Sequence, residues 1–157
     1  MPRCATRWRR TSSSTRGVDV SVVVFAHRPE APRHVEYLEW LDSARTDDEP
    51  LGLSDVVLSG FVRVVTHPRI FRDPTPLADA LEFATVMRAA PAAVTVAPGP
   101  RHWPLFEQLR TTTEARGNAV PDACLAALAI EQGTTWYTCD RSFARFPGLH
   151  WEHPLDG

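Results

Sequence analysis

The sequence predicts an α/β domain in which a mainly parallel central sheet is covered by helices on both faces. Short apolar segments rich in β-branched residues alternate along the chain with longer segments that have helical spacing. That order is typical of right-handed βαβ units, whose strands run parallel. The chain has 157 residues, of which 43% are hydrophobic, which suits one buried core and leaves little room for two.

Five segments are expected to be strands. They are residues 18–26, 51–53, 93–96, 134–138 and 149–151. The first is a run of β-branched residues interrupted only by Asp19 and Ser21, and its lack of alternation is typical of a strand buried on both faces.

Five further segments have apolar residues at helical spacing. They are residues 33–45, 55–65, 76–90, 103–113 and 120–132. Ser54 is expected to cap the second of these helices and Gly133 to end the fifth. The third helix places four apolar residues on one face, namely Leu77, Leu81, Ala84 and Met87.

The basic charge is concentrated at the N-terminus. Residues 1–17 hold five arginines and no acid, and we expect them to form a disordered tail ahead of a domain over 18–157. A start codon assigned too far upstream would give the same pattern. Without those five arginines, 12 basic residues face 19 acidic ones. This balance argues against a basic nucleic-acid surface, but it permits an enzyme that meets phosphate through bound cations.

The cysteines and the hydropathy favour a cytoplasmic protein. Cys4, Cys124 and Cys139 are odd in number and widely spaced, which suits neither a disulfide framework nor a zinc site. No segment approaches the roughly 20 apolar residues of a membrane helix. Asp19 also interrupts the one run that resembles a signal peptide. We therefore expect no membrane association.

Four aspartates are expected near one edge of the sheet, because the carboxyl ends of parallel strands lie together. Asp19 lies in the first apolar segment, and Asp140 follows the fourth strand. Asp55 and Asp122 each lie in the first turn of a helix, where the helix dipole alone can explain an acid. Asp19 is different, because a carboxylate within an apolar segment is costly to bury without partners.

Clustered carboxylates repel one another and need a cation to be tolerated. Oxygen ligands without a competing His or Cys group suit Mg²⁺ or Mn²⁺. Such ions activate water and stabilise displacement at a phosphodiester. The acids therefore predict a metal-dependent phosphodiesterase.

At these residues the sequence resembles the PIN-domain ribonucleases, and within them the VapC toxins of bacterial toxin–antitoxin pairs. The segments that carry the resemblance are residues 18–27, 59–68, 117–129, 138–143 and 146–149. The resemblance implies a three-layer α/β/α sandwich, cleavage of RNA, and neutralisation by a cognate antitoxin. It leaves open whether two copies form a homodimer.

Carried over residue by residue, the resemblance implies metal ligands and supporting residues. Asp19, Asp122 and Asp140 would hold the metal. Asp55 is a further candidate for a catalytic acid only because it is the one acid near Arg63, not because the resemblance implies it. Asn118, Thr138, Arg63 and the residue at position 21 would support the metal ligands.

Three positions depart from the family pattern. Ser21 replaces an Asn, Gly60 replaces an acid three residues before Arg63, and Ser142 replaces an acid after Asp140. Whether Asp55 substitutes for the missing acid is open. The alternative interpretation is a degenerate PIN module that binds RNA or a protein without cleavage.

Overall fold

The chain is described by a computed structural model over residues 14–157. Five parallel strands form its sheet in the order β3-β2-β1-β4-β5. The strands are β1 Arg16–Val18, β2 Leu51–Leu53, β3 Ala93–Thr95, β4 Thr135–Tyr137 and β5 Trp151–Glu152. The expected α/β fold with a parallel sheet is confirmed.

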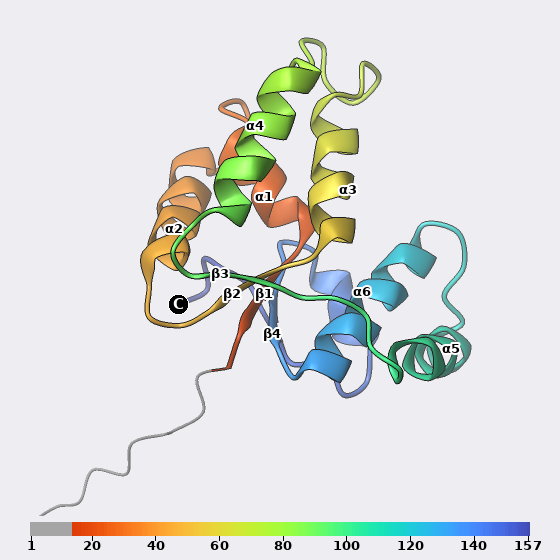
Figure 1. Cartoon of the computed structure of the whole chain (residues 1–157). Coiled ribbons are helices and arrows are strands. Elements are labelled where there is room, and N and C mark those ends of the chain that lie inside the picture. The colour runs from red at the N-terminus through yellow and green to blue at the C-terminus, as the bar shows by residue number, and fades with distance from the viewer. Residues whose placement is uncertain (1–13) are drawn as a thin grey trace, which may run out of the picture.

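In the described part of the chain, six α-helices and one 3₁₀-helix surround this sheet. They are α1 Val20–His27, α2 His34–Thr46, α3 Asp55–Val65, α4 Leu77–Arg88, α5 His102–Thr113, α6 Ala119–Gln132 and the 3₁₀-helix η1 Arg141–Arg145. Figure 1 shows α1 to α4 gathered in the upper part of the view, whereas α5 and α6 lie together at the lower right. None of the helices within residues 14–157 has both the length and the apolar character that a bilayer-spanning segment requires.

The first apolar segment was wrongly predicted as one long strand. Only Val18 of that segment belongs to a strand, and the chain turns at Asp19 into helix α1. The buried residues of α1 lie on more than one side of the helix, since Val22, Val23 and Val24 are consecutive. A helix buried all round has no polar face, so its sequence pattern cannot be told from that of a buried strand.

The boundary between tail and domain also lies earlier than predicted. Arg16 and Gly17 form part of β1 and are buried. The Arg16 guanidinium donates to the Asp47 carboxylate at 2.7 Å, which ties the start of the strand to the turn before β2. Residues 1–13 of the expected tail lie outside the described residues.

The buried face of helix α4 coincides only in part with the predicted one. Leu77 and Leu81 are 59% and 50% exposed, whereas Ala80, Ala84 and Met87 are buried. Helix α4 packs on α3. Two of the three buried residues are alanines, whose small side chains permit a close approach between helices. Leu77 and Leu81 therefore face outward, whereas Ala84 and Met87 of the predicted face are buried.

The strand order positions the candidate site. The chain runs from β1 outward to β2 and β3, then returns to place β4 on the other side of β1. The order therefore reverses between β1 and β4. In open parallel sheets, ligands bind beyond the carboxyl ends of the strands at such a reversal. Asp19 directly follows β1 at this point, and its backbone N–H donates to the Tyr137 carbonyl of β4 at 2.9 Å.

Candidate active site

Asp19 occupies the N-cap position of α1 and is almost fully buried, with 6% of the residue exposed. Its Oδ2 accepts hydrogen bonds from the Ser21 hydroxyl at 2.8 Å and the Thr138 hydroxyl at 2.7 Å. Burial raises the pKa of Asp19, the two hydroxyl hydrogen bonds oppose that rise, and the charge of Asp140 adds to it. Both hydroxyls bind the same carboxylate oxygen of Asp19. The other oxygen accepts no side-chain hydrogen bond from residues 14–157.

Both hydroxyls are themselves oriented by the backbone that follows β4. The N–H of Cys139 donates to the Ser21 hydroxyl at 3.2 Å, and the N–H of Asp140 donates to the Thr138 hydroxyl at 3.0 Å. Each hydroxyl thus receives one hydrogen bond and passes one on to Asp19, an arrangement in which successive hydrogen bonds strengthen one another. Ser21 and Thr138 lie where the resemblance placed supporting residues.

Asp140 lies at the end of this network and is exposed to solvent. Its Oδ1 caps helix η1 by accepting from the Ser142 N–H at 2.8 Å. Asp140 therefore has a structural role as an N-cap, and its charge also acts on Asp19 and Asp122.

Asp122 is half-buried in the first turn of α6. Burial raises the pKa of Asp122 to about 6, and the negative charges of Asp19 and Asp140 contribute to the rise. The structure thus brings Asp19, Asp122 and Asp140 from distant parts of the sequence into one electrostatically coupled site.

Arg145 is a site residue that the sequence did not reveal. Its charge lowers the pKa of Asp122, in opposition to the burial and the two acids. Its Nε donates to the Ser142 carbonyl at 3.0 Å, which holds the side chain along η1. The only signal in the sequence was the position of Arg145 five residues after Asp140. In a short segment without regular spacing, such a position does not identify an arginine as part of a site.

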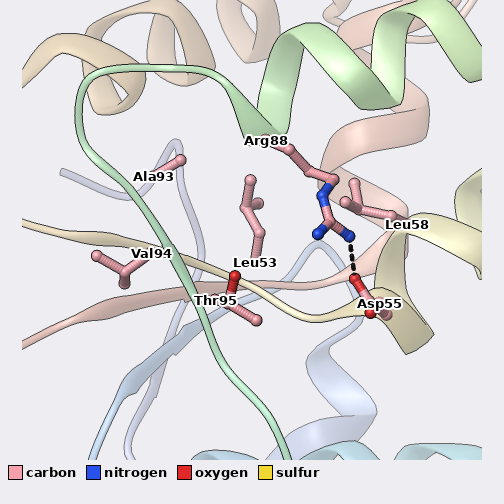
Figure 2. A pocket seen from close by; sticks show the side chains of 7 residues that line it. All are labelled: Leu53, Asp55, Leu58, Arg88, Ala93, Val94 and Thr95. Carbon is pink, nitrogen blue, oxygen red and sulfur yellow. Dashed lines mark hydrogen bonds and ion pairs between the residues drawn. The ribbon is translucent and has the colours of Figure 1, made fainter.

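Asp55 lies apart from the other three acids. It is 74% exposed at its side chain and forms an ion pair with Arg88 at the end of α4. Figure 2 shows the two side chains facing each other beside a small cavity that Leu53 and Thr95 also line. Neither Asp19 nor Asp122 has Asp55 among the charges that shift its pKa. These contacts suit a structural role that links α3 to α4, and the catalytic role of Asp55 stays a prediction.

Arg63 and Asn118 line a groove between α3 and α6 that adjoins the carboxylates. Gly60 lies in the wall of the same groove, where the family pattern has an acid. A Cβ atom at Gly60 would come within 2.9 Å of Val20 Cγ2. The contact between α1 and α3 therefore leaves no room for a side chain at position 60 unless Val20 shifts.

The carboxylate oxygens of the site are the type of ligand that a hard divalent cation prefers. They do not surround the position of such an ion on all sides. The three acids supply only carboxylate oxygens, and their mutual repulsion is opposed by Arg145 alone among the charges that act on Asp122. Within residues 14–157, no group of three acids, histidines or cysteines is close enough together to enclose a metal ion. Mg²⁺ commonly binds through one or two carboxylates and retains water as its other ligands, so this arrangement is compatible with it.

The fold and the site together define an α/β protein with a carboxylate site at the reversal point of a parallel sheet. The family model that describes the PIN domain matches residues 18–149. The chain therefore belongs to the PIN-domain family, and within it to the VapC proteins, as the following relatives show.

Two curated relatives cover most of the chain. The VapC ribonuclease Mb2897 of Mycobacterium bovis is 51% identical over 140 residues, which make up 89% of this chain and 95% of the relative. Ribonuclease VapC25 of Mycobacterium tuberculosis is 36% identical over 137 residues, 87% of this chain and 96% of the relative.

Solved structures agree on the fold. VapBC2 of Rickettsia felis, bound to a DNA fragment from its promoter, matches with a TM-score of 0.63 and 18% identity over 88% of this chain and 98% of that chain. FitAcB of Neisseria gonorrhoeae matches with a TM-score of 0.64 and 19% identity over 91% of this chain and all of that one. At these identities the likeness supports the fold alone.

Proposed function

We propose that the chain is an Mg²⁺-dependent endoribonuclease that acts as the toxin of a VapBC pair, with Mn²⁺ as an alternative ion. The observation that carries the proposal is the coupled set of Asp19, Asp122 and Asp140 at the reversal point of the sheet. Membership of the VapC group supports RNA as the substrate, since the curated relatives are named ribonucleases.

The residues of the chain have separate roles in this proposal. Asp19 and Asp122 would hold the metal, with Asp140 beside them, and the bound ion would supply positive charge that activates water and stabilises the phosphodiester under attack. Ser21 and Thr138 fix Asp19 through one oxygen and leave the other for the ion. Arg145 would offset excess negative charge when a phosphate enters.

The proposal includes a protein partner. The solved structures that share this fold include VapBC complexes, which supports a cognate antitoxin for this chain. A cationic segment of that antitoxin would be attracted to the three carboxylates and compete with the metal there. We further propose that the protein works in the cytoplasm, where the free thiols of Cys124 and Cys139 would stay reduced. A homodimer remains an open alternative to a monomeric toxin.

The proposal is tested by incubating the purified full-length chain with a fluorescently labelled single-stranded RNA. Mg²⁺ should support cleavage, a chelator should stop it, and added Mg²⁺ should restore it. Asp19→Asn should remove the activity while leaving the circular dichroism spectrum unchanged. Cleavage that continues in excess chelator, or in the Asp19→Asn protein, would refute the metal mechanism.

A second candidate function is a PIN module that binds without cutting. Gly60 in place of an acid and the lack of a completed cage among the described residues favour it. Isothermal titration calorimetry with Mg²⁺ and with Mn²⁺ separates the two functions. Heat of binding that disappears in Asp122→Asn supports the nuclease, whereas no heat at millimolar ion supports the binding module.

A further inference from the structure

The groove beside the carboxylates has a volume of about 560 Å³ and two helical walls. Residues at helical spacing on α3 form one wall, and the first turns of α6 form the other. Val20 and Pro121 line the groove, and they are the chain neighbours of Asp19 and Asp122 respectively. The groove therefore lies next to the acidic site, although none of the three aspartates is among the residues that line it.

Among the described residues that line the groove, Arg63 alone is charged. It is exposed, and its guanidinium forms no hydrogen bond or ion pair with any of residues 14–157. Its apolar neighbours on α3 include Val56, which is 51% exposed. A cation without a partner in a mostly apolar groove has its donors available for an anionic ligand.

Asn118 lines the groove from the opposite wall, and its side chain does not cap the helix that it begins. It occupies the N-cap position of α6, where an Asn side chain ordinarily accepts a hydrogen bond from the helix. Here its backbone is helical, with φ −65° and ψ −16°, and the side chain makes no capping hydrogen bond. The amide therefore keeps both its donor and its acceptor for a ligand.

We propose that this groove binds the RNA strand next to the cleaved bond, with Arg63 holding a phosphate and Asn118 hydrogen-bonding a base. The inference rests on the proposed ribonuclease function. A guanidinium binds phosphate through two parallel hydrogen bonds, and the apolar walls suit the faces of unpaired bases. Both residues are substrate-positioning residues in this account, because neither belongs to the carboxylate set.

Charge distinguishes RNA from the antitoxin as the occupant of the groove. A cationic antitoxin segment is attracted to the carboxylates themselves, but within the groove it would meet the like charge of Arg63, which disfavours it there. A phosphate chain that approaches the same carboxylates is repelled by them and attracted by Arg63. The arginine therefore offsets a repulsion that only the anionic occupant experiences.

Fluorescence anisotropy with a labelled single-stranded RNA of mixed sequence tests the inference. All proteins carry Asp122→Asn so that the RNA stays intact, and affinity is measured over a range of salt concentrations. Arg63→Gln should weaken binding about tenfold or more and reduce the slope of log affinity against log salt by about 0.7, which is the effect of one lost phosphate contact. Arg63→Lys should restore the slope, because it keeps the charge.

Arg72→Ala is the matched control, since Arg72 is an exposed arginine between α3 and α4 that does not line the groove. It should leave affinity and slope unchanged. With Asp122 intact, Arg63→Gln should raise KM and leave kcat nearly unchanged, and Asn118→Ser should alter the preferred base without changing the slope.

The outcomes separate this inference from the proposed function. If the wild-type chain cleaves RNA but Arg63→Gln has the wild-type slope and KM, the groove assignment is wrong and the ribonuclease proposal stands. If Arg63→Gln instead weakens only neutralisation by a purified antitoxin, the groove belongs to the protein partner and the inference is overturned. If no RNA is cut or bound by any variant, the proposed function itself has failed.

Discussion

The side chains that hold Asp19 have unequal burial, and this difference predicts unequal effects of mutation. Thr138 is fully buried, whereas Ser21 is half-buried. The Thr138 hydroxyl both donates to Asp19 and accepts from the Asp140 N–H. Its removal therefore leaves the Asp140 N–H without this partner, and it leaves Asp19 Oδ2 with only the hydrogen bond from Ser21.

We expect Thr138→Val, which conserves shape, to lower the free energy of unfolding by about 1–3 kcal/mol. Ser21→Ala should cost less, because water can reach the groups that it leaves. Urea denaturation of the three proteins, read by tryptophan fluorescence, measures the difference. Equal losses of unfolding free energy in the two variants would contradict the expectation that the more deeply buried hydroxyl contributes more to stability.

Asp122 predicts a dependence of stability on pH in the metal-free protein. Its pKa is raised to about 6 in the folded chain from an ordinary value of 3.8. Between these two values the unfolded chain ionises Asp122 while the folded chain holds its proton. The contribution of Asp122 to the free energy of unfolding is therefore fully present below about pH 4 and is lost as the pH rises through about 6.

Asp122→Asn should remove this trend, since an amide does not titrate. Thermal unfolding without metal should show the variant gaining stability relative to the wild type from about pH 4 to about pH 8. Mg²⁺ should reduce that gain at the higher pH by stabilising the wild-type protein alone. A difference in stability between the two proteins that does not change with pH would contradict the raised pKa of Asp122.

At the scale of single residues, the sequence identified the aspartates of the site more completely than it identified the charged residues around them. Asp19 was predictable because a carboxylate in an apolar segment needs partners, and the structure supplies Ser21 and Thr138. Arg145 was not predictable, because its influence on Asp122 depends on the position of η1 relative to α6. That position follows from tertiary packing.

The packing of α1 against α3 limits which residues position 60 can accept. Gly60 of α3 lies against Val20 of α1, and a Cβ atom added to the glycine would be only 2.9 Å from Val20 Cγ2. An alanine in a helix is ordinarily about 1 kcal/mol more favourable than glycine. Overpacking against a stiff β-branched side chain costs about 1–3 kcal/mol and opposes that gain.

We therefore expect the effect of Gly60→Ala on the free energy of unfolding to change sign with the residue at position 20. In the wild-type background it should be neutral or destabilising, and in a Val20→Ala background it should stabilise by up to about 1 kcal/mol. A double-mutant cycle in urea measures the coupling. Stabilisation of the same size in both backgrounds would show that the contact does not limit position 60.

Among the elements, those with a polar face were predicted well and the fully buried one was not. Helices α2 and α3 have exposed charged residues that reveal their periodicity, and Ser54 caps α3 through its hydroxyl as expected, at 3.2 Å from the Val56 N–H. Helix α1 has buried valines on successive positions and lacks such a face. Its helical state depends on the turn at Asp19, which only the sheet context reveals.

At the scale of the whole molecule, topology accounts for the site more completely than any single motif. Asp19 and Asp140 follow the adjacent strands β1 and β4, and α6 brings Asp122 beside them. Asp55 follows β2 on the other side of β1 and pairs with Arg88 instead. The alternation of strands and helices predicted the parallel sheet, but the strand order that separates Asp55 from the other acids was not readable from it.

The most direct measurement compares RNA cleavage by the wild-type chain with cleavage by Asp122→Asn and Asp55→Asn in Mg²⁺. If Asp19, Asp122 and Asp140 form the active site, Asp122→Asn should lower the rate by about a hundredfold or more. Asp55→Asn, which removes only an exposed ion pair, should retain a rate within about twofold of the wild type. A wild-type rate in Asp122→Asn, with the rate lost in Asp55→Asn, would contradict this account of the site.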